Sequence, residues 1–375
     1  MCYNYFCISH TEPWQSGNAT DSKSVEPLIA AHAFESRWLL NQAGRLSCFL
    51  FAICGIIAFI TKSKTPKKRR WLRITLIIVA VLVVIDIAAA LYFYHVAFIR
   101  NNQPATQVKK SSPNYGLVQD FDKLPKSTKT ITNDGLKLDA WYVPAATKTD
   151  KTVIVVHGYH ENKSNMRQYG MLFHQLGYNV LMPDDRSAGD SEGDYISFGY
   201  YDKDDVNAWA HSLVSSDKNV DITLYGLSLG AATVMMASSL PTLPHQVSSI
   251  IEDCGYDNVM NEISYQAKQQ YNLPAFPIVY SVSLENKLRQ GWFFSEGSST
   301  AALAKDTRPI LMIHGTADTF VPYSMLQVNY DAVKAGTPKE ELSVKGAVHA
   351  HSFETAPKLY RSTVSNFMDK YNPVK

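Results

Sequence analysis

A short run of residues around Ser228 has the composition that an acyl-transferring serine requires. It reads Gly226-Leu227-Ser228-Leu229-Gly230, a G-x-S-x-G pattern that follows an apolar, β-branched run and precedes a helical pattern. A serine on so tight a turn brings the residues two positions away into contact, which favours glycine at both. The N–H groups that open the following helix favour negative charge beside the hydroxyl. We therefore predict that Ser228 is a nucleophile, and a serine that merely caps the helix is the alternative.

Two later loops carry the residues that a reactive serine needs as partners. A serine hydroxyl needs a base to accept its proton, and that base needs an acid to orient it. Asp318 follows an apolar run that ends at His314, and His349 follows the last such run of the chain. Since the carboxyl ends of parallel strands meet at one edge of a sheet, we expect Asp318 and His349 beside Ser228. Their order along the chain differs from the orders of chymotrypsin and subtilisin but occurs in a third known fold.

Each of these two partners has an alternative. His351 lies two residues after His349 and is the other candidate base, whereas Asp253 follows an earlier apolar run and is the other candidate acid. The two histidines form a His-x-His pair but lack the helical H-E-x-x-H spacing that binds zinc. We therefore expect a reaction that needs no metal and no cofactor.

Attack on a carbonyl creates an oxyanion, and two backbone N–H groups are candidates to bind it. One belongs to Leu229, the residue after the candidate nucleophile. The other belongs to Tyr159, within the His157-Gly158-Tyr159 loop that follows a predicted strand. Each donor of this kind contributes about 2.7–4 kcal/mol to the transition state. We expect His157 itself to brace the loop rather than to take part in catalysis.

Strand and helix patterns alternate from residue 127 onward. The predicted strands are 127–132, 136–143, 152–156, 179–182, 221–225, 247–251, 309–314 and 342–344. The predicted helices are 166–176, 203–213, 231–238, 323–335 and 357–371. Such alternation favours a mostly parallel sheet covered on both faces, while Asn133-Asp134-Gly135 predicts a hairpin that makes the first strands antiparallel.

Residues 256–303 interrupt this alternation. They show no strand pattern, and a structureless insertion of that length is improbable in a compact domain. We predict a helical cap over the carboxyl edge of the sheet. Its aromatic side chains either line an acyl pocket or pack the interior of the cap. They are Tyr256, Tyr265, Tyr271, Phe276, Tyr280, Trp292, Phe293 and Phe294.

Together these residues resemble the α/β-hydrolase superfamily over about residues 115–371. The resemblance is carried by His157-Gly158, Asp185-Arg186, Gly189-Asp190-Ser191-Glu192-Gly193, the Ser228 pentapeptide and the Asp318 and His349 loops. Segments 193–200 and 273–277 are similar to uncharacterised membrane-anchored hydrolases of Gram-positive bacteria, of the serine aminopeptidase or esterase kind. The resemblance implies an α/β-hydrolase fold, a mostly parallel doubly wound sheet with a helical cap, and acyl transfer. Ala188 stands where many members have histidine, and we expect only local packing to differ.

The front of the chain predicts a membrane anchor. Residues 74–99 are apolar apart from Thr75, Asp86 and His95, and about 20 such residues cross a bilayer. The preceding segment 61–73 holds seven basic residues and no acidic one, which places it in the cytoplasm and the later domain outside the cell. Asp86 costs roughly 2.5–3.5 kcal/mol at mid-bilayer, and we interpret it either as a tolerated protonated acid or as a helix–helix contact.

Other parts of the front of the chain leave alternatives open. Segment 46–60 is apolar but short, so it is either a second span or a re-entrant piece. A cleaved signal peptide, with its cleavage site at Ala88-Ala89-Ala90, is the rival to the uncleaved anchor. Residues 1–45 receive no role, 100–114 is a predicted linker, and 115–373 is the predicted hydrolase domain.

Composition narrows the range of partners. The chain has 36 basic and 34 acidic residues, so without the seven basic residues of 61–73 it has 29 basic against 34 acidic. That mildly acidic remainder offers no basic surface for nucleic acid, and we expect no nucleic-acid partner. Only Cys254 of the five cysteines falls within the predicted domain, so no disulfide forms inside it.

The combined prediction is a carboxylesterase-like serine hydrolase at the outer face of the cell membrane. Its anchor is single-pass, or two-pass if 46–60 also crosses, and its partners are the lipid bilayer and a small acyl ester or peptide-like substrate. A peptidase or amidase that acts on short peptides is the first alternative. A non-catalytic binding module on the same fold is the second, and it would be expected to have lost a residue of the Ser228, Asp318 and His349 set.

Overall fold

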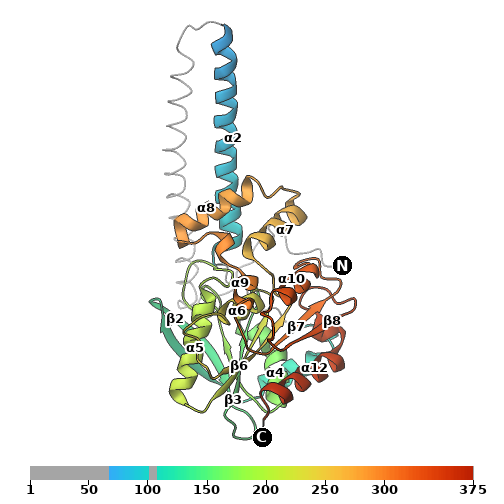
Figure 1. The fold of residues 1–375 in the computed structure, drawn as a ribbon. Coiled ribbons are helices and arrows are strands. Elements are labelled where there is room, and N and C mark those ends of the chain that lie inside the picture. The colour runs from blue at the N-terminus through green and yellow to red at the C-terminus, as the bar shows by residue number, and fades with distance from the viewer. Residues whose placement is uncertain (1–66, 101–107, 375) are drawn as a thin grey trace, which may run out of the picture. The chain divides into compact units, whose positions relative to one another are not determined.

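The computed structural model describes residues 67–100 and 108–374. Contacts within the chain divide it into two compact units, Met1–Val84 and Ile85–Lys375. The predictions for 1–45 and 46–60 lie outside the described residues. Figure 1 shows the elements of the second unit, in which the cap helices lie beyond one edge of the sheet and the C-terminus lies at the other.

One eight-stranded sheet forms the centre of the Ile85–Lys375 unit. Its strand order is β1-β2-β4-β3-β5-β6-β7-β8, with antiparallel pairing from β1 to β2 and from β2 to β4 and parallel pairing elsewhere. The strands are β1 Ser127–Asn133, β2 Leu136–Val143, β3 Lys151–Val156, β4 Asn179–Pro183, β5 Asp221–Leu227, β6 Val247–Asp253, β7 Ile310–Gly315 and β8 Lys339–Val344. The predicted mostly parallel sheet and its antiparallel hairpin are confirmed.

Alternating side chains of the central strands enter two separate apolar cores. On β3, Val153 and Val155 join the core that is closed by helices α4 and α12, whereas Ile154 and Val156 join the core closed by α5, α6 and α10. Both faces are therefore buried, which explains why these strands have no polar face. The helices are α4 Arg167–Gln175, α5 Asp202–Ser216, α6 Leu229–Ala237, α10 Ser324–Ala332 and α12 Pro357–Tyr371.

Several short elements depart from the sequence prediction. Helix α3 (Tyr115–Asp122) was not predicted, because its eight residues present only Val118 and Phe121 to the core and carry too little periodicity. A 3-10 turn (Lys163–Met166) precedes α4, and a short helix α11 (Ser352–Thr355) precedes α12. Strands β5 and β6 extend two residues beyond the predicted ends, which brings their last residues to the carboxyl edge.

The stretch 256–303 is helical, as predicted. It contains α7 Val259–Tyr271, α8 Ile278–Gln290, a 3-10 turn Phe294–Glu296 and α9 Ser299–Leu303. Its aromatic side chains divide into two groups. Tyr256, Trp292 and Phe294 are buried in a third apolar core, whereas Tyr271, Phe276, Tyr280 and Phe293 are exposed.

Helix α2 (Lys67–Phe98) contains a 29-residue apolar stretch, Arg70–Phe98, that is long enough to cross a membrane. Its last turns belong to the Ile85–Lys375 unit, where Ala90, Tyr94 and Phe98 are buried in the same third core as the cap. Asp86 accepts a hydrogen bond from Ser281 Oγ of α8 at 2.5 Å. Of the two interpretations of Asp86, the structure therefore shows the helix–helix contact.

Candidate active site

The backbone at Ser228 is held in a conformation that few residues other than glycine adopt. Ser228 has φ 57° and ψ −112° between the end of β5 and the start of α6, and its N–H donates to the Asp253 carbonyl at 2.8 Å. A Cβ at Gly226 would lie 2.1 Å from the Gly230 oxygen, and one at Gly230 would lie 2.4 Å from the Val156 oxygen. The predicted need for both glycines is confirmed.

Ser228, His349 and Asp318 form a continuous hydrogen-bonded chain. Ser228 Oγ lies 2.8 Å from His349 Nε2, and His349 Nδ1 lies 2.7 Å from Asp318 Oδ2. Ser228 is 6 % exposed, while His349 is partly exposed and the Asp318 side chain is fully buried. The structure thus brings together the three residues that were predicted from loops far apart in the sequence.

Asp318 is surrounded by hydrogen-bond donors. The backbone N–H groups of Phe320 and Val321 donate to its Oδ1 at 2.9 and 3.0 Å, and both His349 and His314 approach its Oδ2. Burial alone would raise the pKa of this carboxyl, but the hydrogen bonds from His314 and His349 outweigh it and lower the pKa to about 2. Asp318 is therefore an anion at every physiological pH.

His314 is a second histidine at this acid, and sequence reasoning missed it. It ends β7, is fully buried, and places Nε2 3.2 Å from Asp318 Oδ2 and 3.0 Å from the Val321 carbonyl. Burial lowers the pKa of His314, but the neighbouring Asp318 and Glu252 carboxylates reverse this and raise it. The only sequence signal was its position four residues before Asp318, where it was interpreted as the end of a strand.

The two alternative partners make other contacts. Asp253 Oδ2 accepts from the Tyr360 hydroxyl at 2.8 Å, and that hydroxyl also lies 2.9 Å from the Tyr225 hydroxyl. Burial raises the pKa of Asp253 to about 6, although the Tyr360 hydrogen bond counteracts it. His351 is exposed, and its Nδ1 lies 2.7 Å from the His349 carbonyl.

The loop that carries Tyr159 lies against the turn at Ser228. A Cβ at Gly230 would also meet the His157 carbonyl at 2.6 Å, which measures how closely the two backbones approach. The Tyr159 hydroxyl donates to the Ala97 carbonyl of α2 at 2.9 Å. Within the described part of the chain, no acceptor takes the N–H of Tyr159 or the N–H of Leu229, the first residue of α6.

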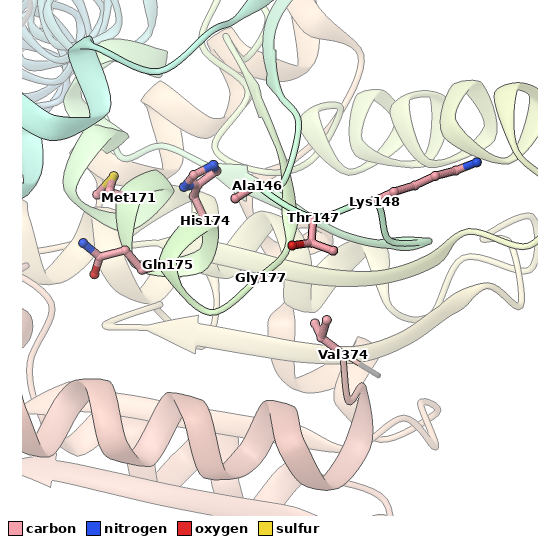
Figure 2. Close-up of a pocket in the computed structure, with 8 residues that line it drawn as sticks. All are labelled: Ala146, Thr147, Lys148, Met171, His174, Gln175, Gly177 and Val374. Atoms are coloured by element: carbon pink, nitrogen blue, oxygen red, sulfur yellow. The ribbon is translucent and has the colours of Figure 1, made fainter.

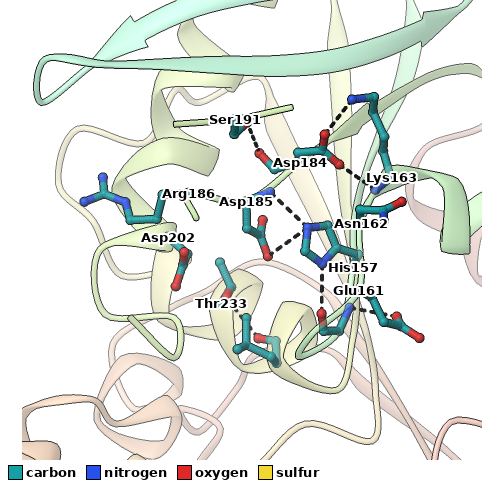
Figure 3. Close-up of polar contacts among 12 residues, drawn as sticks. His157, Glu161, Asn162, Lys163, Asp184, Asp185, Arg186, Ser191, Asp202 and Thr233 are labelled. Atoms are coloured by element: carbon teal, nitrogen blue, oxygen red, sulfur yellow. Dashed lines mark hydrogen bonds and ion pairs between the residues drawn. The ribbon is translucent and has the colours of Figure 1, made fainter. Parts of the chain in front are cut away.

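His157 braces this loop, as predicted. It is buried, with Nδ1 2.8 Å from the Gly158 carbonyl and Nε2 3.0 Å from the Asp185 N–H (Figure 3). A carbonyl requires a donor and an N–H requires an acceptor, so the ring is neutral with its proton on Nδ1. The ring therefore links two loops through their backbones.

A carboxylate cluster beside His157 already contains a cation. Lys163 is buried and places its ammonium 2.8 Å from Asp139, 2.5 Å from Asp184 and 2.7 Å from Asp190. Figure 3 shows Lys163 and Asp184 next to the His157 loop. Burial of the lysine favours its neutral form, but the hydrogen bonds that the ammonium donates to these aspartates dominate and raise its pKa. The protein itself thus supplies one positive charge, shared by the three carboxylates.

Figure 2 shows the residues that line a surface cavity of about 470 Å³. Lys148 and Gly177, which precede β3 and β4, contribute to its lining together with His174 and Val374. Because residues before parallel strands lie at the amino edge, this cavity opens at the edge opposite Ser228. None of the predicted site residues lines it.

The sheet order, the turn at Ser228 and the loops after β7 and β8 define an α/β-hydrolase fold. Residues 147–252 match the family described as serine aminopeptidase, S33. The uncharacterized protein YqkD of Bacillus subtilis is 29 % identical over 301 residues, which are 79 % of this chain and 97 % of that protein. The uncharacterized protein YfhR of Escherichia coli K12 is 24 % identical over 251 residues, which are 65 % of this chain and 80 % of that protein.

Solved structures show the same fold. An esterase of Pyrococcus furiosus matches with a TM-score of 0.56 and 23 % identity, over 72 % of this chain and 97 % of that one. An acylaminoacyl peptidase of Pyrococcus horikoshii matches with a TM-score of 0.52 and 18 % identity, over 68 % of this chain and 44 % of that one. The chain is therefore similar to serine hydrolases in fold, and its residues must specify the reaction.

Proposed function

We propose that this chain is an esterase in which Ser228 is the nucleophile, His349 the general base and Asp318 the orienting acid. The observation that supports this most directly is the 2.8 Å contact between Ser228 Oγ and His349 Nε2. That distance allows direct transfer of the hydroxyl proton. The 2.7 Å contact to Asp318 keeps the proton of neutral His349 on Nδ1, which leaves Nε2 free to accept.

The proposed reaction has two acyl-transfer steps. Ser228 Oγ bonds to the ester carbonyl carbon as its proton passes to His349 Nε2, and the N–H groups of Tyr159 and Leu229 bind the oxyanion. The intermediate expels the alcohol, which takes the proton from His349 and leaves an acyl ester on Ser228. Water then attacks this ester, His349 accepts a proton from the water, and release of the acid returns that proton to Ser228. No cofactor enters either step.

A peptidase or amidase is the second candidate function. It is favoured by the family match to serine aminopeptidase, S33, and by the similarity in fold to an acylaminoacyl peptidase. The same residues would serve, but His349 would have to protonate a poorer leaving group, an amine. A panel of acyl esters and aminoacyl amides, compared by kcat/KM with the full-length chain, would separate the two functions.

The matched control for such a panel is a pair of serine variants. Ser228→Ala removes the proposed nucleophile, whereas Ser362→Ala removes an exposed hydroxyl on α12 that donates to the Leu359 carbonyl. We expect Ser362→Ala to retain wild-type hydrolysis and Ser228→Ala to lose it for every substrate in the panel. Hydrolysis of the preferred ester by Ser228→Ala at the wild-type rate would disprove the assignment.

We also propose that α2 anchors the enzyme in the cell membrane with the hydrolase domain outside. The apolar stretch Arg70–Phe98 and the basic residues that precede it support this orientation. A membrane-impermeant fluorophosphonate should label the protein on intact cells. Labelling that appears only after lysis would show the opposite orientation while leaving the reaction unaffected.

A further inference from the structure

Helix α8 of the cap exposes a face without polar side chains other than one tyrosine hydroxyl. Its exposed residues are Tyr280, Leu284 and Leu288, with exposed fractions of 55 %, 51 % and 74 %. A spacing of four places them on one side of the helix. Phe276, just before the helix, is 74 % exposed as well. A helix face toward water is normally polar, so this surface calls for a partner.

The charged residues of α8 are held in ion pairs. Arg289 pairs with Glu285 and lies over the Tyr94 ring, and both side chains are mostly buried. Lys287 pairs with Glu296 at 3.3 Å. The most exposed side chains of α8 are thus apolar, and Lys287, its one charged side chain that is more than a third exposed among the described residues, is paired with Glu296.

Hydrogen bonds fix α8 against the part of α2 that follows Ile85. Ser281 donates to Asp86, and Gln290 donates to the Tyr94 hydroxyl at 3.0 Å. These contacts lie eight residues apart on α2, so α8 accompanies that helix over about two turns. At the end of α7, the Tyr271 ring of the cap lies 4.8 Å from the Phe93 ring of α2.

The length of a membrane span then gives the depth of this contact. A span that starts after the basic residue Arg73 needs about 20 helical residues and therefore ends near Phe93. Asp86 is one of these roughly 20 residues, so the end of α8 that contacts Asp86 lies at the depth of the span. Tyr92, Phe93 and the contacting Tyr271 lie at the end of the span. That end is the membrane–water boundary, where aromatic side chains are enriched.

We propose that the apolar face of α8 (Phe276, Tyr280, Leu284 and Leu288) is inserted into the leaflet of the lipid bilayer that faces the hydrolase domain. The partner of this surface is the acyl region of membrane lipids, and the cap rather than α2 alone holds the domain at the membrane. This inference rests on the proposed α2 anchor. Its reasons are the exposed apolar side chains of α8, their continuity with α2, and the number of residues that a span requires.

The test is fluorescence from an environment-sensitive nitrobenzoxadiazole label at single cysteines. The full-length chain carries Cys2→Ser, Cys7→Ser, Cys48→Ser and Cys54→Ser, while buried Cys254 is kept. The label is placed at Leu284→Cys, and the protein is reconstituted in liposomes of phosphatidylcholine and phosphatidylglycerol. We expect emission shifted to shorter wavelength and quenching by lipids that carry a nitroxide on the acyl chain.

Two matched positions make the outcome decisive. Leu359 on α12 is exposed to the same degree as Leu284, and a label at Leu359→Cys should be quenched only by an aqueous quencher. A label at Val81→Cys reports on α2 itself. Quenching by lipid at Val81 but not at Leu284 would overturn the inference about α8 and leave the α2 anchor intact. This holds whether the label at position 284 contacts water or a second copy of the chain. Loss of lipid quenching at both positions would overturn the α2 anchor as well. Ester hydrolysis measured on the same samples tests the proposed reaction independently of both quenching results.

Discussion

Two buried carboxyl groups, Asp318 at the carboxyl edge of the sheet and Glu262 in the cap, have pKa values shifted in opposite directions. Asp318, in the loop after β7, accepts two backbone N–H groups and faces two histidines, and its pKa falls to about 2. Glu262 on α7 is as deeply buried and accepts a hydrogen bond from Gln266, but burial dominates and raises its pKa to about 8. Burial acts in the same direction on both, so the donors decide the charge.

This contrast separates what each region contributes. At the carboxyl edge, short loops attached directly to strands supply donors to a fixed charge, and that arrangement specifies a reaction. In the cap, apolar packing holds the helices and leaves aromatic and aliphatic side chains such as Phe276 and Leu288 exposed. In the proposed function, the cap would govern what the protein contacts, while the carboxyl edge would govern the reaction.

The largest effect is expected from neutralising the acid at the carboxyl edge. Asp318→Asn keeps the shape but removes the charge and favours the wrong tautomer of His349, so kcat should fall by about 10⁴-fold. Asp253→Asn changes the neighbouring buried acid, which bonds to Tyr360, and should alter kcat by far less. Steady-state ester hydrolysis by both variants measures the difference. Equal losses would mean that the two acids share the role.

A pH-dependent effect on stability is expected in the cap. The pKa of Glu262 rises from an ordinary 4.5 to about 8, so its contribution to stability is fully present below pH 4.5 and is lost as pH rises through 8. Each pKa unit corresponds to about 1.4 kcal/mol. Glu262→Gln should flatten the fall in the free energy of unfolding between these pH values. Parallel curves for the two proteins in denaturant titrations would show that Glu262 ionises normally.

A smaller effect is expected where α2 meets the loop that carries Tyr159. Tyr159→Phe removes the hydrogen bond to the Ala97 carbonyl and should lower stability by about 1 kcal/mol, with a correspondingly modest loss of kcat. Tyr280→Phe removes an exposed hydroxyl on α8 and serves as the matched control. Thermal unfolding in detergent compares them. A Tyr159→Phe variant as stable as Tyr280→Phe would show that the contact contributes nothing.

The carboxyl edge was largely predictable because its local rules are strict. The two glycines around Ser228 are required by backbone contacts, and Asp318 and His349 each follow a recognisable strand. His314 was missed because a histidine at the end of an apolar run resembles any core residue. Only the folded loop shows that its ring turns toward Asp318.

The cap and its contact with α2 were predictable only as helices. Ser281 and Asp86 are 195 residues apart, and nothing local to either indicates the pairing. The sequence of α8 mixes aliphatic, hydroxyl and charged residues along its length, so it did not indicate that Leu284 and Leu288 are exposed while Val282 is buried. Helix faces of this kind are assigned by tertiary packing, which a single sequence does not reveal.

Covalent labelling of the purified full-length chain with a fluorophosphonate tests the central claim most directly. The proposal predicts one adduct, located by peptide mass spectrometry on Ser228, with labelling slowed strongly in Asp318→Asn and absent in Ser228→Ala. Ser362→Ala should label like the wild type. An adduct that forms in Ser228→Ala at the wild-type rate would contradict the assignment of the nucleophile.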